Sequence, residues 1–376
     1  MRIGIDARVL DRKITGTGRY LLNLLYELPQ QDSKNEYVLF TNADLDIDQN
    51  FYKVVRIEKS IVPFKIFSPY YLNVILPRLI KKEKIDVLFS PNILIPIVKM
   101  EGVKFISVVH DVIPWVYPGY YPYLYKKYLS FFVPRSLQKS DIVITVSKHS
   151  MRDIINTFGL PEDKIRVVHN TASDKFIKSN KVTNDLLNSF KDLDLPDNYL
   201  LYVGVIEPRK NVMGLIKIFD ELNRKGSNLR LVIVGKPGYN SQSIMNEIAK
   251  RGKNIIHFPY LFDDPLAHTF KNAFAFIFPS YYEGFGIPPL EAMQCGIPVL
   301  ASNRSSLTEV VGEGGILYDP DNHDKFVEDI IKLENDSDFY NLMKSKSLKQ
   351  AAKFNIKETA NKLINILNEV GYNIKL

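Results

Sequence analysis

Short apolar runs alternate with longer amphipathic stretches along the whole chain. Repetition of a strand-sized run and a helix-sized stretch is typical of parallel sheets wound by strand–helix–strand units. The strands predicted in the first half are Ile3–Asp6, Tyr37–Thr41, Val54–Ile57, Val87–Phe89, Phe105–Val109, Ile142–Val146 and Arg166–Val168. Those predicted in the second half are Tyr199–Val203, Leu231–Val234, Ile255–Phe258, Ala273–Phe278, Pro298–Ala301 and Gly315–Tyr318. The pattern therefore predicts an α/β protein with two Rossmann-like sheets.

The length of the chain indicates more than one domain. Its 376 residues exceed what one hydrophobic core usually serves, so two domains of about 180 residues each are expected. A polar stretch rich in turn residues predicts a linker at 176–197, between an N-terminal domain at 1–175 and a C-terminal domain at 198–355. The stretch at 356–376 is an amphipathic helix that we expect to return to the N-terminal domain. We expect the two domains to face each other across a cleft.

Composition narrows the class of protein. Hydrophobic residues make up 45% of the chain and charged residues 24%, as in ordinary globular proteins. Cys295 is the only cysteine, which excludes an intramolecular disulfide and favours the cytoplasm. No signal peptide is predicted, and no apolar run reaches the roughly 20 residues of a membrane span. The net charge of +7 favours anionic partners, but the basic residues are scattered, so no nucleic acid is expected.

A glycine-rich segment follows the first predicted strand. Backbone N–H groups of Gly16, Thr17 and Gly18 could approach a phosphate or a sugar at the start of a helix. Leu21 occupies the third glycine position of the dinucleotide fingerprint, which disfavours a dehydrogenase. A plain tight turn is the alternative.

His110 follows another predicted strand directly. At the carboxyl end of that strand its imidazole could hydrogen-bond a sugar hydroxyl. The alternative is a structural hydrogen-bonded pair with Asp111.

Arg209 and Lys210 are adjacent cations on a turn that opens a predicted helix. Two cations and free helix N–H groups can clamp a pyrophosphate without a metal ion. A solvated basic turn is the alternative.

Two carboxylates follow the strand at Ala273–Phe278. Glu283 lies on the loop, and Glu291 lies about a turn into a helix whose first turn holds two prolines. Because carboxylates accept hydrogen bonds from vicinal hydroxyls, one could hold a sugar and the other a ribose. Backbone N–H groups nearby add donors, from Phe285, Gly286 and Ile287.

Two other patterns are less specific. The Asp-x-Asp spacings at 44–48 and 192–194 do not follow strand ends, so they are interpreted as solvated loops and no metal site is predicted. The aromatic segment Trp115–Phe132 contains Lys126 and Lys127, and three interpretations stay open. It could rest on a bilayer surface, line the acceptor side of the cleft, or pack in the core.

Together these motifs resemble the family 4 glycosyltransferases, retaining enzymes of the GT-B fold, over nearly the whole chain. The resemblance rests on six features: the glycine segment Gly16–Arg19, His110, the Val146-Ser147 strand end with Asn170 after it, Glu207-Pro208-Arg209-Lys210, the Glu283-x7-Glu291 pair, and Gly296-x-Pro298-Val299. Some relatives carry a further phosphate-binding arginine where this chain has Gly204-Val205.

The resemblance implies a role for each matching residue. Arg209 and Lys210 would bind the donor pyrophosphate, Glu283 the hydroxyls of the donor sugar, and Glu291 the nucleotide ribose. His110 would contact the sugar ring, and Gly16 to Gly18 would approach the phosphate and the acceptor. His110, Arg209, Lys210 and Glu283 form the expected catalytic set, without a metal or a cofactor. The acceptor would attack from the front face while cations stabilise the departing diphosphate.

The resemblance implies a hexosyltransferase, with mannose as the favoured sugar and GDP-mannose as the favoured donor. UDP-glucose and dTDP-rhamnose stay open. The expected acceptor is a glycan or a lipid-linked glycan in surface polysaccharide synthesis, with peripheral contact at the inner face of the membrane as an open question. The alternatives are a GT-B nucleotide-sugar epimerase and a non-catalytic nucleotide-sugar-binding scaffold protein.

Overall fold

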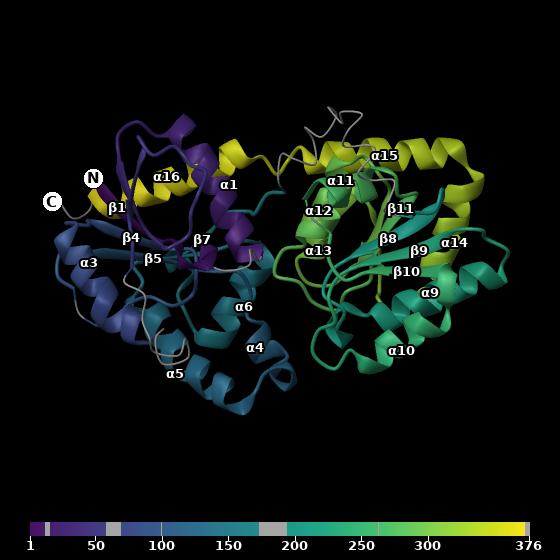
Figure 1. Cartoon of the computed structure of the whole chain (residues 1–376), viewed down its shortest axis with the longest axis horizontal. Helices are drawn as coiled ribbons and strands as arrows, with labels where there is room; N and C mark the ends of the chain where they lie inside the picture. Colours follow the sequence, from purple (N-terminus) through teal and green to yellow (C-terminus); the bar gives the residue numbers. More distant parts are fainter. Residues whose placement is uncertain (12–15, 58–68, 99, 173–193, 262, 373–376) are drawn as a thin grey trace. The chain divides into compact units, whose positions relative to one another are not determined.

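The structure, a computed structural model, describes residues 1–11, 16–57, 69–98, 100–172, 194–261 and 263–372. The chain divides into two compact units, one of Met1–Thr171 with Asn355–Leu376 and one of Ala172–Phe354. Each unit holds one parallel sheet with helices packed on it (Figure 1). The predicted linker at 176–197 lies largely outside the described residues.

The sheet of the first unit has seven parallel strands in the order β3-β2-β1-β4-β5-β6-β7. Their bounds are β1 Arg2–Asp6, β2 Glu36–Phe40, β3 Tyr52–Val55, β4 Val87–Ser90, β5 Lys104–Val109, β6 Ile142–Thr145 and β7 Ile165–Val167. Each overlaps a strand predicted from the sequence. The prediction for β3 starts two residues late, because Tyr52 is buried and pairs with Tyr37 of β2.

Helices cover both faces of this sheet, because successive strand residues point to opposite sides. On one face Ile3, Ile5 and Phe89 pack with α1 and α16; on the other face Val38 and Leu88 pack with α3. The helices and short turns are η1 Ala7–Leu10, α1 Gly16–Gln31, η2 Tyr71–Ile75, α3 Leu76–Lys82, α4 Ile113–Val116, η3 Pro118–Tyr120, α5 Tyr123–Lys139, α6 Lys148–Phe158, η4 Glu162–Lys164 and α16 Ile356–Tyr372.

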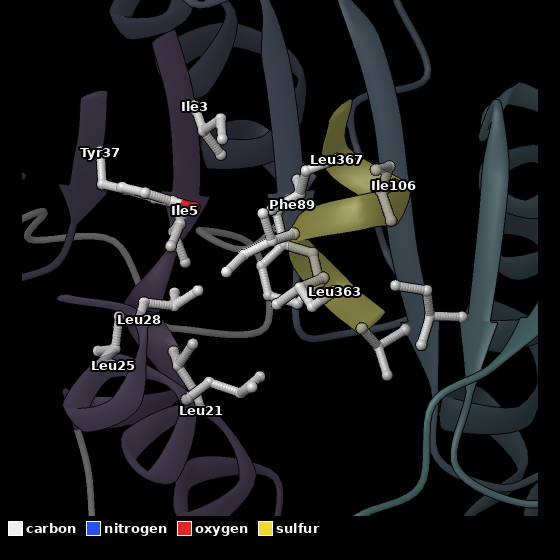
Figure 2. Close-up of a cluster of buried hydrophobic side chains, with 14 of the residues drawn as sticks. Ile3, Ile5, Leu21, Leu25, Leu28, Tyr37, Phe89, Ile106, Leu363 and Leu367 are labelled. Carbon is white, nitrogen blue, oxygen red and sulfur yellow. The ribbon is translucent and has the colours of Figure 1, made fainter. Parts of the chain in front are cut away.

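The last described helix, α16, is part of the core of the first unit. Leu363 and Leu367 lie against Phe89 and Ile106 of the sheet (Figure 2). The same cluster contains the apolar face of α1, and α1 and α16 touch each other. The two ends of the chain therefore build one hydrophobic core.

The sheet of the second unit has six parallel strands in the order β10-β9-β8-β11-β12-β13. Their bounds are β8 Tyr199–Val203, β9 Arg230–Val234, β10 Ile255–Phe258, β11 Ala275–Phe278, β12 Val299–Ser302 and β13 Ile316–Tyr318, and all six were predicted to within two residues. The other elements are η5 Pro208–Lys210, α9 Val212–Arg224, α10 Gln242–Lys250, η6 Gly252–Asn254, α11 Asp263–Lys271, α12 Ile287–Gln294, α13 Leu307–Val310, η7 Gly312–Gly314, α14 His323–Asn335 and α15 Ser337–Ala351.

This strand order reverses direction between β8 and β11, as in doubly wound nucleotide-binding sheets. In the described part of the chain, no helix combines the length and the apolar character that crossing a bilayer requires.

Candidate functional site

The two predicted motifs of the second half lie at the point where the strand order reverses. Strand β8 leads into η5 and α9, and its neighbour β11 leads into the loop at 279–286 and α12. Ligands of open α/β sheets bind outside the carboxyl ends of the strands at this point. The fold therefore brings the Arg209-Lys210 turn and the Glu283 loop to one edge of the sheet.

Two cations and two carboxylates form a cluster at this edge. The ammonium of Lys210 lies 2.5 Å from one oxygen of Glu283, and the guanidinium of Arg209 lies 2.5 Å from Glu207 and 3.8 Å from Glu283. Arg209 also donates a hydrogen bond to the carbonyl of Tyr282. Each cation therefore already has a carboxylate partner.

The cluster is largely removed from water. The side chains of Lys210 and Glu283 are 12% and 10% exposed, and the Lys210 ammonium lies 5.3 Å from the centre of the Phe278 ring. Burial lowers the pKa of Lys210 below its ordinary value, and the attraction of the Glu283 carboxylate offsets part of that effect. Charge interactions in such a setting are stronger than at an exposed surface. The predicted alternative of a solvated basic turn is wrong.

Two serines hold the Glu283 loop from the neighbouring strand end. The Ser305 hydroxyl accepts a hydrogen bond from the Glu283 N–H at 2.8 Å. The buried Ser306 hydroxyl contacts the carbonyls of Glu283 and Phe285 at 2.9 and 2.7 Å. Ser305 has a φ of 52°, in the left-handed region that non-glycine residues rarely adopt. The loop is therefore fixed on both sides of the carboxylate.

The second predicted carboxylate, Glu291, lies on α12 and is 3% exposed. Gly286 precedes this helix with a φ of 108°, which only glycine adopts easily, and prolines occupy the first turn as predicted. The first N–H groups of a helix have no partner inside it, and because the two prolines carry none, the N–H of Ile287 is the first-turn donor that can face an anion or a hydroxyl. Phe285, Gly286 and Ile287 thus connect the Glu283 loop to the helix of Glu291.

The remaining predicted residues lie in the first unit. Gly16, Thr17 and Gly18 form the first turn of α1, and residues 12–15 before them lie outside the described residues. In the same helix the ring of Tyr20 meets the ring of His110 edge to face, with 5.1 Å between ring centres. The structure therefore brings the glycine segment and His110 into one neighbourhood, next to the end of β5.

One hydrogen bond determines the tautomer of His110. Its Nε2 lies 3.0 Å from the carbonyl of Pro91, an acceptor only, so Nε2 carries the proton. Burial lowers the pKa of His110 to about 4, so the ring is neutral at pH 7 and its Nδ1 is an acceptor. Asp111 instead accepts a hydrogen bond from the N–H of Ile113 at the start of α4, so the two side chains do not form the predicted structural pair.

Other acidic groups in the described residues serve the local structure. Asp44 pairs with Arg56 at 2.6 Å, and Asp48 accepts hydrogen bonds from two backbone N–H groups that follow it. Asp192 lies outside the described residues. Within those residues, no group of three or more His, Cys, Asp or Glu side chains is placed to hold a metal ion.

The sequence did not predict two residues of this site, and it left the role of a third open. Glu207 was part of the motif but had no predicted partner, and Ser305 and Ser306 were not considered. The serines follow β12, and a polar residue just after a strand is the signal that could have identified them. Their partners are more than 20 residues away in the sequence, which local patterns do not reveal.

Comparison with known proteins gives two family matches. The model described as "Glycosyl transferases group 1" matches residues 187–353, and "Glycosyltransferase Family 4" matches residues 14–174. The chain is 28% identical to the O-antigen chain mannosyltransferase B of Escherichia coli, over 97% of this chain and 99% of that protein. It is 30% identical to the O-antigen chain mannosyltransferase RfbU of Salmonella typhimurium, over 60% of each.

A solved structure extends the likeness to the fold. The Anabaena HepE structure in complex with UDP-glucose has a TM-score of 0.75, with 16% identity over 98% of this chain and 100% of that one. The predicted fold and family are confirmed. The chain belongs to the group 1, family 4-like glycosyltransferases and has the GT-B fold.

Proposed function

We propose that this glycosyltransferase moves a hexose from a nucleotide sugar to a glycan or lipid-linked glycan, with retention of configuration, during surface polysaccharide synthesis. The observation that carries the proposal is the buried cluster of Arg209, Lys210, Glu207 and Glu283 at the reversal of the second sheet. It offers two cations to a diphosphate at the edge where nucleotides bind in such sheets.

Donor binding is an exchange of partners at Lys210. In the absence of a ligand the Lys210 ammonium donates a hydrogen bond to one carboxylate oxygen of Glu283. A diphosphate carries more charge and more oxygens than one carboxylate, so it displaces Glu283 and takes its place. The loop does not need to unfold, because Ser305 and Ser306 bind its backbone rather than the carboxylate. The released carboxylate can then accept hydrogen bonds from hydroxyls of the donor sugar.

The same cations serve the chemical step. When the bond between the sugar and the diphosphate breaks, negative charge grows on the leaving phosphate. Lys210 and Arg209 are already in place and little exposed, so they stabilise that charge without reorganisation. Neither Glu283 nor Glu291 acts as a nucleophile in this proposal; the acceptor hydroxyl attacks from the face of the leaving group, and Glu291 holds the nucleotide ribose.

His110 contributes a neutral hydrogen-bond acceptor. With Nε2 committed to Pro91, its Nδ1 can accept a hydrogen bond from a hydroxyl of the sugar. A ring with a pKa near 4 takes up no proton at pH 7, so His110 orients the sugar and does not act as a general base. The first turn of α1, from Gly16 to Gly18, provides N–H groups for the phosphate and the acceptor.

Mannose is the favoured sugar because both curated relatives described above are O-antigen mannosyltransferases. GDP-mannose is therefore the favoured donor, without a metal or another cofactor. UDP-glucose, which is bound in the HepE structure, and dTDP-rhamnose are the alternatives.

The test is thermal stabilisation by a panel of GDP, UDP and dTDP and their sugars in the presence of EDTA. A ligand that binds only the folded state raises the melting temperature by mass action. At a ligand concentration of a hundred times its Kd, the free energy of unfolding rises by about 2.7 kcal/mol. We expect guanine nucleotides to stabilise the wild type and Lys210→Ala to lose the shift. Lys253→Ala, an exposed lysine of the same unit, is the matched control and keeps it.

The outcomes separate the candidate functions. Stabilisation followed by transfer to a glycan acceptor supports the proposal. Conversion of the donor sugar without an acceptor identifies an epimerase, and binding without turnover identifies a scaffold. A requirement for a divalent metal, or a Lys210→Ala variant that binds as the wild type does, contradicts the proposed donor site.

A further inference from the structure

A loop from one edge of the second sheet contacts the turn that carries Lys210. This loop, residues 319–322, follows β13, which β11 and β12 separate from β8, and we call it the β13 loop. Asn211, the residue after Lys210, donates a hydrogen bond from its side-chain amide to the carbonyl of Pro320 at 2.9 Å. The turn is therefore attached to a part of the unit that neither β8 nor α9 provides.

Asn211 uses both polar atoms of its amide. Its Oδ1 accepts a hydrogen bond from the N–H of Gly214 at 3.1 Å and so caps the start of α9, while its Nδ2 binds the β13 loop. Its backbone has a φ of 53°, in the left-handed region that asparagine tolerates better than most residues. A Cβ at position 214 would lie 2.5 Å from this Oδ1, so a larger residue there would push the amide away. The sequence from Lys210 to Gly214 is therefore adapted to the position of one side chain.

The β13 loop also contacts the segment that carries Glu283. The hydroxyl of Tyr281, two residues before Glu283, donates a hydrogen bond to the carboxylate of Asp321 at 2.5 Å. The backbone N–H of Tyr281 donates another to the carbonyl of Arg209 at 2.9 Å. Asp321 is itself held, because its N–H donates to the carboxylate of Asp319 at 3.1 Å. The β13 loop therefore binds both segments that supply the buried ion pair.

These bonds become important when the ion pair opens. In the ligand-free state the Lys210–Glu283 contact joins the turn and the loop directly, and the proposed exchange with a diphosphate removes that contact. The bonds to the β13 loop use neither of these two side chains, so the exchange leaves them in place. The separation of the ammonium and the carboxylate then depends on them and on the backbone bond between Tyr281 and Arg209.

We propose that Asn211, Tyr281 and Asp321 are positioning residues, which hold the two charged groups of the donor site at a fixed separation after the ion pair has opened. The inference rests on the proposed function, because it assumes that both groups contact one nucleotide sugar. Catalysis needs both contacts at once, and a misplacement of about 1 Å can reduce a rate about 100-fold. A bare nucleoside diphosphate contacts only the cations, so its binding is much less sensitive to the position of the carboxylate.

The test removes the exposed Tyr281–Asp321 bond from either side, with Tyr281→Phe or Asp321→Ala. The probes are GDP-mannose and GDP, or the donor that stabilises the wild type in the panel above and its diphosphate. We expect each variant to lower kcat/KM for transfer roughly 5- to 10-fold. The Kd of the bare diphosphate, from calorimetric titration, should change by less than about twofold. The double variant should be no worse than either single variant, because both changes remove one hydrogen bond.

Three further variants separate positioning from stability. Asp321→Asn keeps an acceptor oxygen and should restore kcat/KM to within about twofold of the wild type. Asn211→Gly keeps the left-handed backbone but loses the amide, and it should show the same split between kcat/KM and the Kd of the diphosphate. Tyr340→Phe is the matched control, because its hydroxyl donates to the carbonyl of Phe274 at 3.1 Å in the same unit but outside the donor site. Its kcat/KM should equal that of the wild type, and melting temperatures confirm that all variants fold.

Four results overturn the inference. They are a kcat/KM of Tyr281→Phe within about twofold of the wild type, an equal loss in Tyr340→Phe, additive effects of Tyr281→Phe and Asp321→Ala, or a Kd of the diphosphate that rises as much as kcat/KM falls. All four require an active wild type, so they leave the proposed function intact. A wild type that binds no nucleotide sugar of the panel contradicts the proposed function and this inference with it.

Discussion

The first strands of the two sheets, β1 and β8, each end in a cation–carboxylate pair, and the two pairs differ in how they are closed. After β1, Arg8 binds both oxygens of Asp6 at 2.7 Å, and its guanidinium lies 3.6 Å from the centre of the Tyr71 ring. After β8, Lys210 binds one oxygen of Glu283, which comes from a separate loop. In the first pair, the guanidinium of Arg8 makes two hydrogen bonds to one carboxylate and stacks on the Tyr71 ring. In the second pair, the Lys210 ammonium makes one hydrogen bond to a carboxylate on a separate loop.

The difference indicates that an ion pair after the first strand of a sheet can serve either stability or ligand binding. In the bidentate Asp6–Arg8 pair, both carboxylate oxygens accept hydrogen bonds from the guanidinium, so a ligand gains little by replacing either group. We therefore interpret this pair as structural. A single contact between separate loops leaves room for exchange, and in the proposed mechanism a diphosphate replaces the Glu283 carboxylate at Lys210. We therefore expect substitutions in the first pair to change stability and substitutions in the second to change ligand binding and turnover.

The largest effect is expected for Glu283→Gln. Removal of this carboxylate frees Lys210 for a diphosphate but takes away the proposed acceptor for the sugar hydroxyls. We expect the bare nucleoside diphosphate to bind as tightly as in the wild type or a few times more tightly, while kcat/KM for transfer falls about 100-fold or more. Calorimetric titration and steady-state kinetics measure the two quantities. Weaker binding of the bare diphosphate to Glu283→Gln than to the wild type would contradict the exchange mechanism.

The next effect is on stability, with Asp6→Asn. The change leaves the guanidinium of Arg8 largely buried without a carboxylate and should lower the free energy of unfolding by about 3 kcal/mol. The nucleotide-induced shift in melting temperature should not change, because the second unit is intact. Asp44→Asn breaks an exposed pair with Arg56 and should cost less than about 1 kcal/mol. Equal losses in denaturant titrations of the two variants would contradict the assignment of the Arg8 pair.

The effect that is smallest near neutral pH is a pH dependence due to His110. The folded state holds its pKa at about 4, below the ordinary 6.5, so between these values the unfolded chain binds one more proton. The free energy of unfolding should therefore decrease as pH falls from 6.5 toward 4, by at most about 1.4 kcal/mol per pH unit, with no contribution above that range. His110→Gln keeps a donor for Pro91 but does not titrate. The difference between the two stability curves should show this slope; parallel curves would refute a buried, neutral His110.

The sequence predicted the strands well because their signal is local. Tyr199–Val203 is apolar over its whole length and Ile255–Phe258 is apolar except for His257, and turn residues bound both runs, so β8 and β10 were predicted without error. The positions of Arg209 and Glu283 at strand ends followed from the same pattern, since parallel strands share one functional edge.

The pairing inside the site could not be predicted in this way. Lys210 and Glu283 are 73 residues apart, and their contact depends on the adjacency of β8 and β11 and on the path of two loops. The backbone conformation of Ser305 and the division of the aromatic segment at its prolines likewise depend on tertiary packing or on competing local signals. The tautomer of His110 required the position of the Pro91 carbonyl.

The place of α16 in the first core has a consequence for biosynthesis. Leu363 and Leu367 of α16 complete a cluster whose members outside α16 are encoded in the first half of the chain, so the first unit cannot close its core while the ribosome is still making the second. During that interval the side chains of Phe89 and Ile106 lack the cover of α16, which is synthesised only after the second unit (Figure 2). Because exposed apolar surface promotes aggregation during folding, the nascent chain depends on chaperones or on rapid completion for longer than its domain size suggests.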